Sequence, residues 1–345
     1  MLRTFFRLIV VLLLLALSSG CQQQPPSDIL HLSGETMGTT WSVALCAAPG
    51  GTDTAALRQQ LQDCLDRING LMSTYDPTSE ISRFNDQTGS DWFAITGETA
   101  EVIALSLEIS RLTDGAFDIT VGPLVELWGF GARPRGAQIP SDEEVRASLA
   151  AVGYQHLELR REPAAIRKRV PQLRIDLSAV AKGYAVDALA GILKQQGIEN
   201  YLVEIGGELQ VAGERGVGAP WRIAIEKPLD DVREVETIIP LTGLALATSG
   251  NYRNFYLENG QRYAHSLDPV SGRPALHKLA SVTVLDKRCA RADALATALM
   301  VMGEERGRRL CEQLRIAAYF LIHDREALTV YASPAFQTIV QGIQP

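Results

Sequence analysis

The sequence predicts an α+β fold in which mixed or antiparallel sheets pack against helices. Helical and strand-forming segments alternate along the chain, which is typical of this class. The chain has 345 residues, of which 46% are hydrophobic, enough to bury one large core or two smaller ones. It contains no internal repeat, P-loop, GxGxxG motif or CxxC pair. No common nucleotide or zinc motif therefore indicates a function by itself.

The first twenty residues differ from the rest. Arg3 and Arg7 give a positive start, residues 8–17 form an unbroken apolar run, and small residues follow. The apolar run is too short to span a bilayer permanently and is typical of a secretory signal that is removed. We therefore expect a signal peptide over residues 1–20.

Cys21 follows Ser18-Ser19-Gly20, which resembles the lipobox of bacterial lipoproteins, where the cysteine becomes the lipidated N-terminus. Leu17 lies one place earlier than in the usual pattern, and the alternative is ordinary secretion with an unmodified cysteine. Residues 21–34 begin with glutamines and prolines and predict a polar tether. The expected location is the bacterial cell envelope, with a lipid anchor in the membrane and the protein facing the periplasm.

The charge of the chain argues against nucleic-acid partners. It has 33 basic and 40 acidic residues, and loss of residues 1–20 leaves 31 basic residues and a net charge of −9. A domain this acidic has no overall attraction for nucleic acid or anionic lipid. Cys46, Cys64, Cys289 and Cys311 lack close or zinc-type spacing. An exported protein could pair them, but buried thiols are an equal alternative, and we assign no disulfide.

The N-terminal part is expected to form a strand and two helices. Apolar residues alternate with smaller or polar ones over 35–45, which predicts a half-buried strand with Gly38 at its entrance. Apolar residues recur at helical spacing from residue 53 to residue 71 and form a core stripe rather than a site. Thr96 can cap a second helix that runs to Leu112.

Two segments of this half are candidates for binding. Residues 72–85 combine hydroxyls, Tyr75 and a proline turn without helical or strand periodicity, although most such polar loops are only surface. Residues 115–124 place Phe117 and Asp118 among small residues, where an aromatic ring and an acid can hold a planar ligand. The alternative is a buried phenylalanine with the aspartate capping a turn. A capping box then predicts a short helix over 141–151.

Residues 174–177 predict the end of a strand, and Ser178 opens a helix that Gly197 stops. A strand that turns directly into a helix leaves unpaired backbone N–H groups at the positive end of the helix dipole. This is a natural seat for phosphate or metal-bridged phosphate. Most such turns bind nothing, so on this segment alone the alternative that the turn binds no ligand stays open.

The second half is richer in strands. Residues 201–211 predict strand, glycine turn and strand, and further strands are expected over 221–225, 235–239 and 280–285. Residues 247–253 are small and polar, as substrate-contacting loops often are. His265 lies in a strand that ends in turn residues and is a candidate functional residue, although a lone histidine is more often structural.

Residues 290–300 predict a strong helix on which Asp293 and Thr297 share one face. Burying a carboxylate on an apolar helix is energetically unfavourable unless a cation or a hydrogen-bond donor compensates its charge. Oxygen ligands from these two residues and a backbone carbonyl would suit a hard cation such as Mg²⁺. The alternatives are that Asp293 pairs with Arg291 or caps its own helix.

Seven segments in order together resemble the ApbE proteins, periplasmic flavin transferases that move FMN from FAD onto a threonine or serine of a target protein. The segments are Thr36-Met37-Gly38-Thr39, Ser73-Thr74-Tyr75 with Ser79-Glu80-Ile81-Ser82, Gly115-Ala116-Phe117-Asp118-Ile119-Thr120, Asp176-Leu177-Ser178-Ala179-Val180-Ala181-Lys182-Gly183, Ile205-Gly206-Gly207, Ala264-His265-Ser266-Leu267-Asp268-Pro269 and Ala292-Asp293-Ala294-Leu295-Ala296-Thr297. The resemblance implies one domain over 35–335 with a FAD site between two lobes, and a C-terminal tail over 336–345.

The resemblance also implies roles for individual residues. FAD would be held by Met37, Tyr75, Ala116, Phe117, Asp118, Asp176, Lys182 and Leu267, the last standing where isoleucine is common. Mg²⁺ would be held by the backbone carbonyls of Ala179 and Ala296 and the side chains of Asp293 and Thr297. The implied partners are FAD as substrate and an exported flavoprotein subunit that carries the acceptor hydroxyl.

The implied chemistry is transfer of a phosphoryl-linked flavin with release of AMP. A hydroxyl is a poor nucleophile until a base takes its proton, and His265 is our candidate base because imidazole titrates near neutral pH. If water attacks instead, the same site is a Mg²⁺-dependent FAD pyrophosphatase. A third alternative is a lipoprotein that binds FAD without chemistry.

Overall fold

The computed structural model describes residues 29–132, 139–216, 218–229, 232–252, 255–258, 261–324 and 327–343. The expected signal peptide, Cys21 and the first part of the expected tether lie outside these ranges. Within them, no helix is both long and apolar enough to cross a membrane. The four described cysteines are buried free thiols in this structure.

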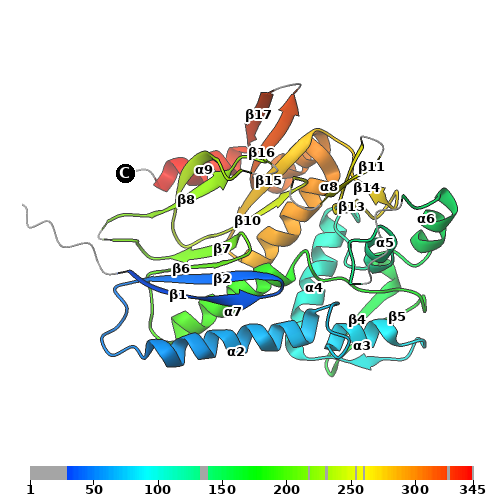
Figure 1. Cartoon of the computed structure of the whole chain (residues 1–345), viewed down its shortest axis with the longest axis horizontal. Helices are drawn as coiled ribbons and strands as arrows, with labels where there is room; N and C mark the ends of the chain where they lie inside the picture. Colours follow the sequence, from blue (N-terminus) through cyan, green and yellow to red (C-terminus); the bar gives the residue numbers. More distant parts are fainter. Residues whose placement is uncertain are drawn as a thin grey trace, which may run out of the picture.

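The fold is α+β, as predicted, and its frame is an eight-stranded antiparallel sheet (Figure 1). The strands lie in the order β1 (Ile29–Thr36), β2 (Thr39–Cys46), β6 (Tyr201–Ile205), β7 (Glu208–Ala212), β10 (Ala245–Gly250), β15 (Leu279–Asp286), β16 (Ala317–Asp324) and β17 (Ala327–Ala332). The first and last thirds of the chain therefore meet in one sheet.

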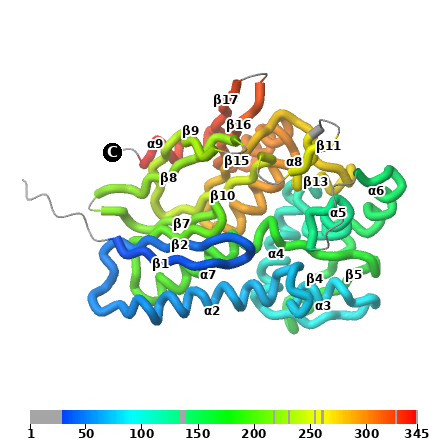
Figure 2. The backbone as a smooth tube through the Cα atoms, viewed as in Figure 1, coloured from blue at the N-terminus to red at the C-terminus, as the bar shows by residue number. Residues whose placement is uncertain are grey.

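Each face of this sheet buries its own core. Helices α2 (Thr54–Met72), α7 (Ala181–Gln195) and α8 (Cys289–Leu314) cover one face, and in Figure 2 α2 runs below the β1–β2 hairpin with α7 beside it. The hairpin β8 (Trp221–Glu226) and β9 (Val235–Leu241), together with α9 (Pro334–Ile343), covers the other face. Alternating side chains of the strands feed the two cores, because successive residues of a strand point to opposite faces.

A second lobe is built from the middle of the chain, beside the sheet (Figure 1). Its helices are α3 (Glu80–Asp86), α4 (Gly97–Leu112), α5 (Gly122–Leu127) and α6 (Asp142–Leu149), with a 3₁₀ turn at Tyr154–His156. Its strands are β3 (Phe93–Ala94), β4 (Leu157–Arg161) and β5 (Ala164–Lys168), in the order β3-β5-β4. The short pairs β11 (Phe255–Glu258) with β12 (Gln261–Ala264) and β13 (Leu267–Asp268) with β14 (Arg273–Pro274) complete the described strands.

Several predicted elements are confirmed. Thr96 caps α4 by accepting a hydrogen bond from Thr99 N, and the Ser141 capping box begins α6. The glycine turn between β6 and β7 is present, with positive φ at Gly206 and Gly207. These signals are local, so tertiary packing has little opportunity to override them.

Three boundaries differ from the predictions. The strand predicted over 35–45 is a hairpin, because Met37 and Gly38, with φ angles of 48° and 71°, make a tight turn between β1 and β2. Residues 29–34 of the expected tether belong to β1 and pair with β2. The expected tail over 336–345 is largely α9, which buries Phe336 against Tyr319.

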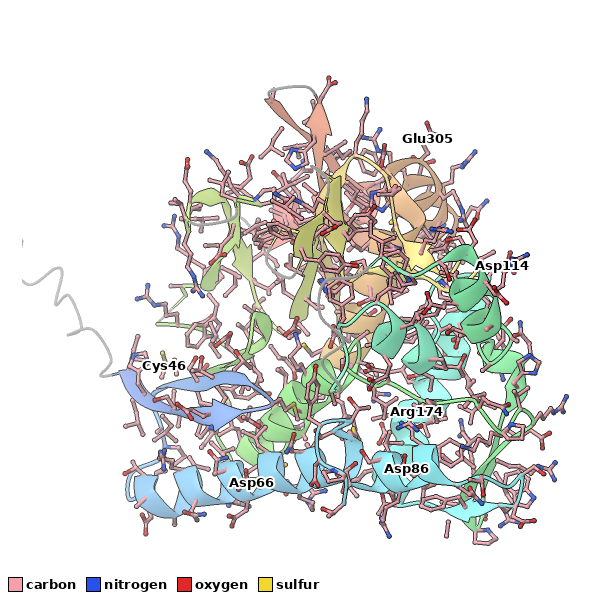
Figure 3. The ribbon with its side chains drawn as sticks, turned by 45° about the vertical axis from the view of Figure 1, so that its right-hand side comes forward. Cys46, Asp66, Asp86, Asp114, Arg174 and Glu305 are labelled. Atoms are coloured by element: carbon pink, nitrogen blue, oxygen red, sulfur yellow. The ribbon has the colours of Figure 1, made fainter. Side chains whose placement is uncertain are left out.

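The strand predicted over 174–177 is also wrong, and the helix after it begins at Ala181 rather than at Ser178. The segment is extended, but within the described residues it forms only an isolated parallel bridge, between Arg174 and Val121, with Asp176 N donating to Ile119 O at 2.8 Å. The side chain of Asn85 accepts from Ile175 N at 2.6 Å and donates to Ile175 O at 2.8 Å. The buried amine of Lys168 donates to Leu173 O at 3.3 Å. Arg174 pairs with Asp86 at 3.1 Å, and Figure 3 shows the two side by side. Side chains of the second lobe and the short backbone bridge to residues 119–121 therefore fix this segment, and no full strand of the described chain pairs with it.

Candidate functional site

A cleft of about 760 Å³ lies between the main sheet and the second lobe. This is within the size range of pockets that bind small molecules. Residues predicted as functional that line it are Tyr75, Ala116, Phe117, Asp118, Asp176, Ala179, Lys182, His265, Leu267, Asp293 and Thr297. Met37 and Ala296 are not among the lining residues: Met37 packs against the core at the β1–β2 turn, and Ala296 is buried within α8. The structure thus brings together residues that span more than two hundred positions.

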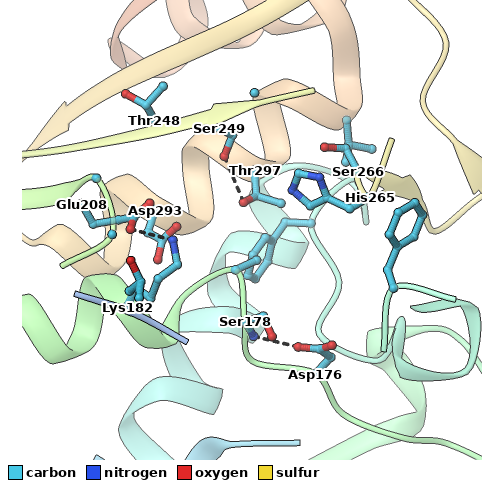
Figure 4. A pocket seen from close by; sticks show the side chains of 18 of the residues that line it. Asp176, Ser178, Lys182, Glu208, Thr248, Ser249, His265, Ser266, Asp293 and Thr297 are labelled. Carbon is cyan, nitrogen blue, oxygen red and sulfur yellow. Dashed lines mark hydrogen bonds and ion pairs between the residues drawn. The ribbon is translucent and has the colours of Figure 1, made fainter. Parts of the chain in front are cut away.

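Three charged side chains gather on one wall of the cleft (Figure 4). Lys182 donates to Glu208 at 2.6 Å, and Asp293 lies beside this pair. Burial raises the pKa of Glu208 to about 7 against the lowering effect of Lys182. Burial lowers the pKa of Lys182, but the two carboxylates outweigh it and the net pKa is raised. The wall is therefore a compact network in which the Lys182 amine lies close to the carboxyl groups of Glu208 and Asp293.

Asp293 also joins the two helices that meet at this wall. Its Oδ2 accepts a hydrogen bond from Gly183 N, in the first turn of α7, at 3.0 Å. Arg291 pairs instead with Glu108 and Asp286, at 2.6 and 3.4 Å. The alternative in which Asp293 pairs with Arg291 is therefore not the one observed.

The same contact affects the turn before α7. A helical N–H at Gly183 would ordinarily donate to the carbonyl four residues earlier, at Ala179. Among the described residues, no backbone N–H donates to Ala179 O. Ala179 lines the cleft, so a backbone oxygen acceptor is available beside Asp293.

Thr297 lies one turn after Asp293 on α8, as the sequence predicts. Its hydroxyl is 3.3 Å from the hydroxyl of Ser249 at the end of β10, and Figure 4 shows the two on the same wall. Both side chains line the cleft. Hydroxyl groups of this kind can coordinate a hard cation or donate a hydrogen bond to a phosphate oxygen.

The oxygen set fits a hard cation that is held in part by substrate. Among the described residues, no three His, Cys, Asp or Glu side chains cluster as a metal site. One carboxylate, one hydroxyl and a backbone carbonyl that the helix does not use remain, from Asp293, Thr297 and Ala179. Mg²⁺ is commonly bound by one or two carboxylates together with substrate phosphates and water. The predicted role of the Ala296 carbonyl stays a prediction, since Ala296 is a buried residue of α8.

The side chain of Asp118 stabilises the turn next to Phe117 by hydrogen bonds. Its Oδ1 accepts from Thr120 N and Thr120 Oγ1 at 2.8 and 2.7 Å, and its Oδ2 accepts from Tyr154 N at 2.7 Å. Burial raises the pKa of Asp118. The turn-capping alternative is therefore the observed one, although both Phe117 and Asp118 also border the cleft.

Two predicted binding residues lie on loops at the edge of the cleft. Tyr75 is 65% exposed, and its hydroxyl donates to Phe130 O at 3.3 Å. Asp176 accepts from Ser178 N at 2.8 Å and so closes the turn before α7. These side chains are available to a ligand that enters from solvent.

His265 is exposed and lines the same cleft. A series of aromatic contacts leads to it: Trp128 stacks on Tyr263, Tyr263 on Tyr256, and Phe130 contacts both Tyr256 and His265, the last at 6.4 Å between centroids. In the view of Figure 4, Thr297 lies between Asp293 and His265. The exposed imidazole therefore packs edge-on against Phe130 where it borders the cleft.

Sequence reasoning missed Glu208 and Gly183 as parts of the site. Glu208 follows the double glycine of the β6–β7 turn, and an acid at the start of a mainly apolar strand is a signal that could have identified it. Gly183 lies in the 176–183 segment that resembles the family, but sequence reasoning assigned it no role. Ser249, in contrast, lies in the small polar segment that was already singled out.

Gly183→Ala should separate the two helices of the site. A Cβ at Gly183 would lie 2.5 Å from the carbonyl oxygen of Cys289 and 2.8 Å from Ala290 Cα. Because both are backbone atoms, we expect a loss of about 1–3 kcal/mol in the free energy of unfolding, measured by urea denaturation.

Gly191→Ala is the matched control on the same helix, since a Cβ there meets nothing within 4 Å. It should raise the free energy of unfolding by about 0.5–1 kcal/mol. Equal behaviour of the two variants would contradict the close contact between α7 and α8.

The chain is similar to known proteins over nearly its whole length. The model of the ApbE family matches residues 37–320. A FAD:protein FMN transferase of Vibrio cholerae is 46% identical, over 95% of this chain and 97% of its own length. The protein of the same description from Escherichia coli K12 is 39% identical, over 93% of each chain.

A solved structure described as the flavin transferase ApbE from Vibrio cholerae has the same fold. It matches with a TM-score of 0.85 and 46% sequence identity, and the match covers 91% of this chain and 100% of that chain. The cleft described above therefore lies within the part of the fold that the two proteins share.

Proposed function

The chain belongs to the ApbE family and transfers flavin from FAD to a target protein, and we propose that the acceptor is a Thr or Ser hydroxyl, that Mg²⁺ is required and that AMP is released. The observation that carries the proposal is that Asp293, Thr297, Ala179 and His265 face one cleft. The side chains that would hold the cation and the candidate base therefore border the same space.

The residues of the cleft divide the work between binding and proton transfer. Lys182 supplies a positive charge at the wall where the diphosphate of FAD would lie, and Glu208 holds that amine in place. The acceptor oxygen forms a bond to the phosphorus of the FMN half, the bond from that phosphorus to AMP breaks, and AMP leaves with the electron pair. His265 takes the proton of the hydroxyl. Mg²⁺, when bound, would neutralise charge on the phosphoryl oxygens.

FAD hydrolysis is the second candidate function. His265 is exposed and the cleft is open to solvent, so water can reach the position of the acceptor hydroxyl. The products would then be FMN and AMP. The two activities use the same site and differ only in the attacking oxygen.

Incubation with FAD, Mg²⁺ and a candidate exported flavoprotein subunit should give an acceptor band that keeps flavin fluorescence after denaturation. Chelation of Mg²⁺ or Asp293→Asn should lower this labelling by more than about a hundredfold, because the metal supplies several kcal/mol of charge stabilisation. Asparagine can still accept from Gly183 N, so the fold is retained.

The outcomes separate the alternatives. AMP release without labelling, even with saturating acceptor, would leave only the pyrophosphatase. Stoichiometric FAD binding with neither product would reduce the protein to a FAD-binding lipoprotein.

His265→Ala should slow labelling by about a hundredfold or more while it changes FAD affinity little, because a general base contributes about 10²–10⁴ to a rate. Single-turnover labelling and FAD titration measure the two effects. His277→Ala is a histidine control, since His277 lies at the Gly303 kink of α8 and is not among the residues that line the cleft. Parallel losses in rate and FAD affinity for His265→Ala would make His265 a binding residue instead.

We further propose that the protein is anchored to the cell envelope through a lipid on Cys21 and acts on the periplasmic side. The support is the signal-like segment 1–20 and the small residues before Cys21. The wild-type chain should incorporate labelled palmitate and enter the detergent phase, and Cys21→Ser should do neither. Incorporation that persists in Cys21→Ser would contradict the assignment.

A further inference from the structure

One wall of the cleft is the open edge of a strand. β10 pairs with β15 along its whole length, from Ala245 to Gly250. On its other side it pairs with β7 only at Ala245 and Leu246. Since β7 begins at Glu208, directly after the glycine turn, residues 247–250 have no partner strand on that side in the described part of the chain.

The hydrogen bonds of β10 show which backbone groups face this edge. Asn251 N donates to Ala280 O, toward β15, and Leu244 O accepts from Val211 N, toward β7. Backbone N–H and C=O groups of successive residues in an antiparallel strand point to alternate sides. The amide and carbonyl groups of Thr248 and Gly250 therefore point away from β15, to the open edge.

This edge lies at the reaction site. Thr248, Ser249 and Gly250 all line the cleft. The side chains of the first two are engaged on opposite faces of the strand: Thr248 bonds Thr283 at 2.8 Å, and Ser249 lies 3.3 Å from Thr297 on α8. The backbone of the edge and the predicted cation ligands therefore border one space.

We propose that the acceptor protein binds by adding an extended segment, antiparallel, to the open edge of β10. The inference rests on the proposed function, which requires a polypeptide carrying a hydroxyl to enter the cleft. A strand edge recognises backbone groups and so accepts an extended peptide, as in other cases of strand addition. FAD has no repeating amide backbone to match this pattern.

The register follows from the same geometry. Residues directly opposite one another on paired strands point their side chains to the same face. The acceptor residue that lies opposite Ser249 presents its side chain to the face of Thr297 and Asp293. Its two neighbours exchange hydrogen bonds with Thr248 and Gly250, while its own N–H points away from β10.

Peptide N-methylation tests this register on the wild-type protein. The probe is a synthetic peptide copied from the flavinylated segment of an acceptor that the protein labels. Methylation of the backbone nitrogen on either neighbour of the acceptor residue should raise the KM for the peptide about tenfold, because each removes a donor to the edge. Methylation at the acceptor residue itself should change KM less than twofold. Equal effects at all three positions, or none, would overturn the proposal.

Thr248→Pro tests the edge from the side of the enzyme. Its N–H is not bonded to β15, so proline removes the donor at the open edge, where strands tolerate it. Proline also removes the hydroxyl that bonds Thr283, as valine does. We expect the KM for the peptide to rise about tenfold, and by clearly more than any change in FAD affinity. Thr248→Val is the matched control, since it keeps the backbone donor and should keep the KM for the peptide.

Failure of this inference is distinguishable from failure of the proposed function. If the wild-type protein labels no acceptor, the transfer function itself fails. If it labels the acceptor and Thr248→Pro has an unchanged KM for the peptide, only the strand-addition proposal fails. If Thr248→Pro weakens FAD and peptide to the same extent, the edge belongs to the FAD site and the proposal is overturned. The methylated peptides decide the question should the proline variant not fold.

Discussion

The site depends on the contact between Gly183 and Asp293. It joins the start of α7 to the middle of the apolar half of α8, with a hydrogen bond of 3.0 Å between a backbone amide and a buried carboxylate. No side chain fits at residue 183, because the backbone of Cys289 already occupies the position of a Cβ. The close contact has a second effect, since the Gly183 amide is directed to Asp293 and the carbonyl of Ala179 stays available to the cleft. A single packing constraint thus aligns two oxygen groups from distant parts of the chain.

The charge network explains how this arrangement is tolerated in an apolar environment. A buried carboxylate without a partner is costly, and removing one partner of a buried pair typically costs about 3–5 kcal/mol. Here Lys182 lies among two acids, and the pKa of Glu208 is raised by burial to about 7. The wall has two acidic side chains and one basic one, and a bound cation would favour the ionised form of the acids. A cation would in turn make the site attractive to a diphosphate, despite the negative charge of the protein as a whole.

The parts of the structure that follow from local sequence could be predicted, and those that depend on tertiary contacts could not. The α4 cap, the β6–β7 turn and the shared face of Asp293 and Thr297 each depend on neighbours within a few residues. The segment 174–177 resembles a strand by composition, yet within the described chain it forms only one isolated bridge, and the Asn85 side chain takes both backbone hydrogen bonds of Ile175. The role of Gly183 cannot be predicted from the sequence, because it depends on how closely α8 approaches α7. Placement of the functional residues in one cleft came from the resemblance, and spacing alone did not give it.

The double glycine of the β6–β7 turn accounts for both the charged wall and the open edge. Because the chain reverses at Gly206 and Gly207, β7 starts at Glu208, and this residue meets Lys182 at the first position of the strand. For the same reason β7 is too short to cover β10 beyond Leu246. An uncovered strand edge is normally a hazard, since it invites pairing with other chains. In an enzyme whose substrate is another protein, the same feature provides a binding surface that needs no particular side chains, and the cleft limits access to it to an extended segment.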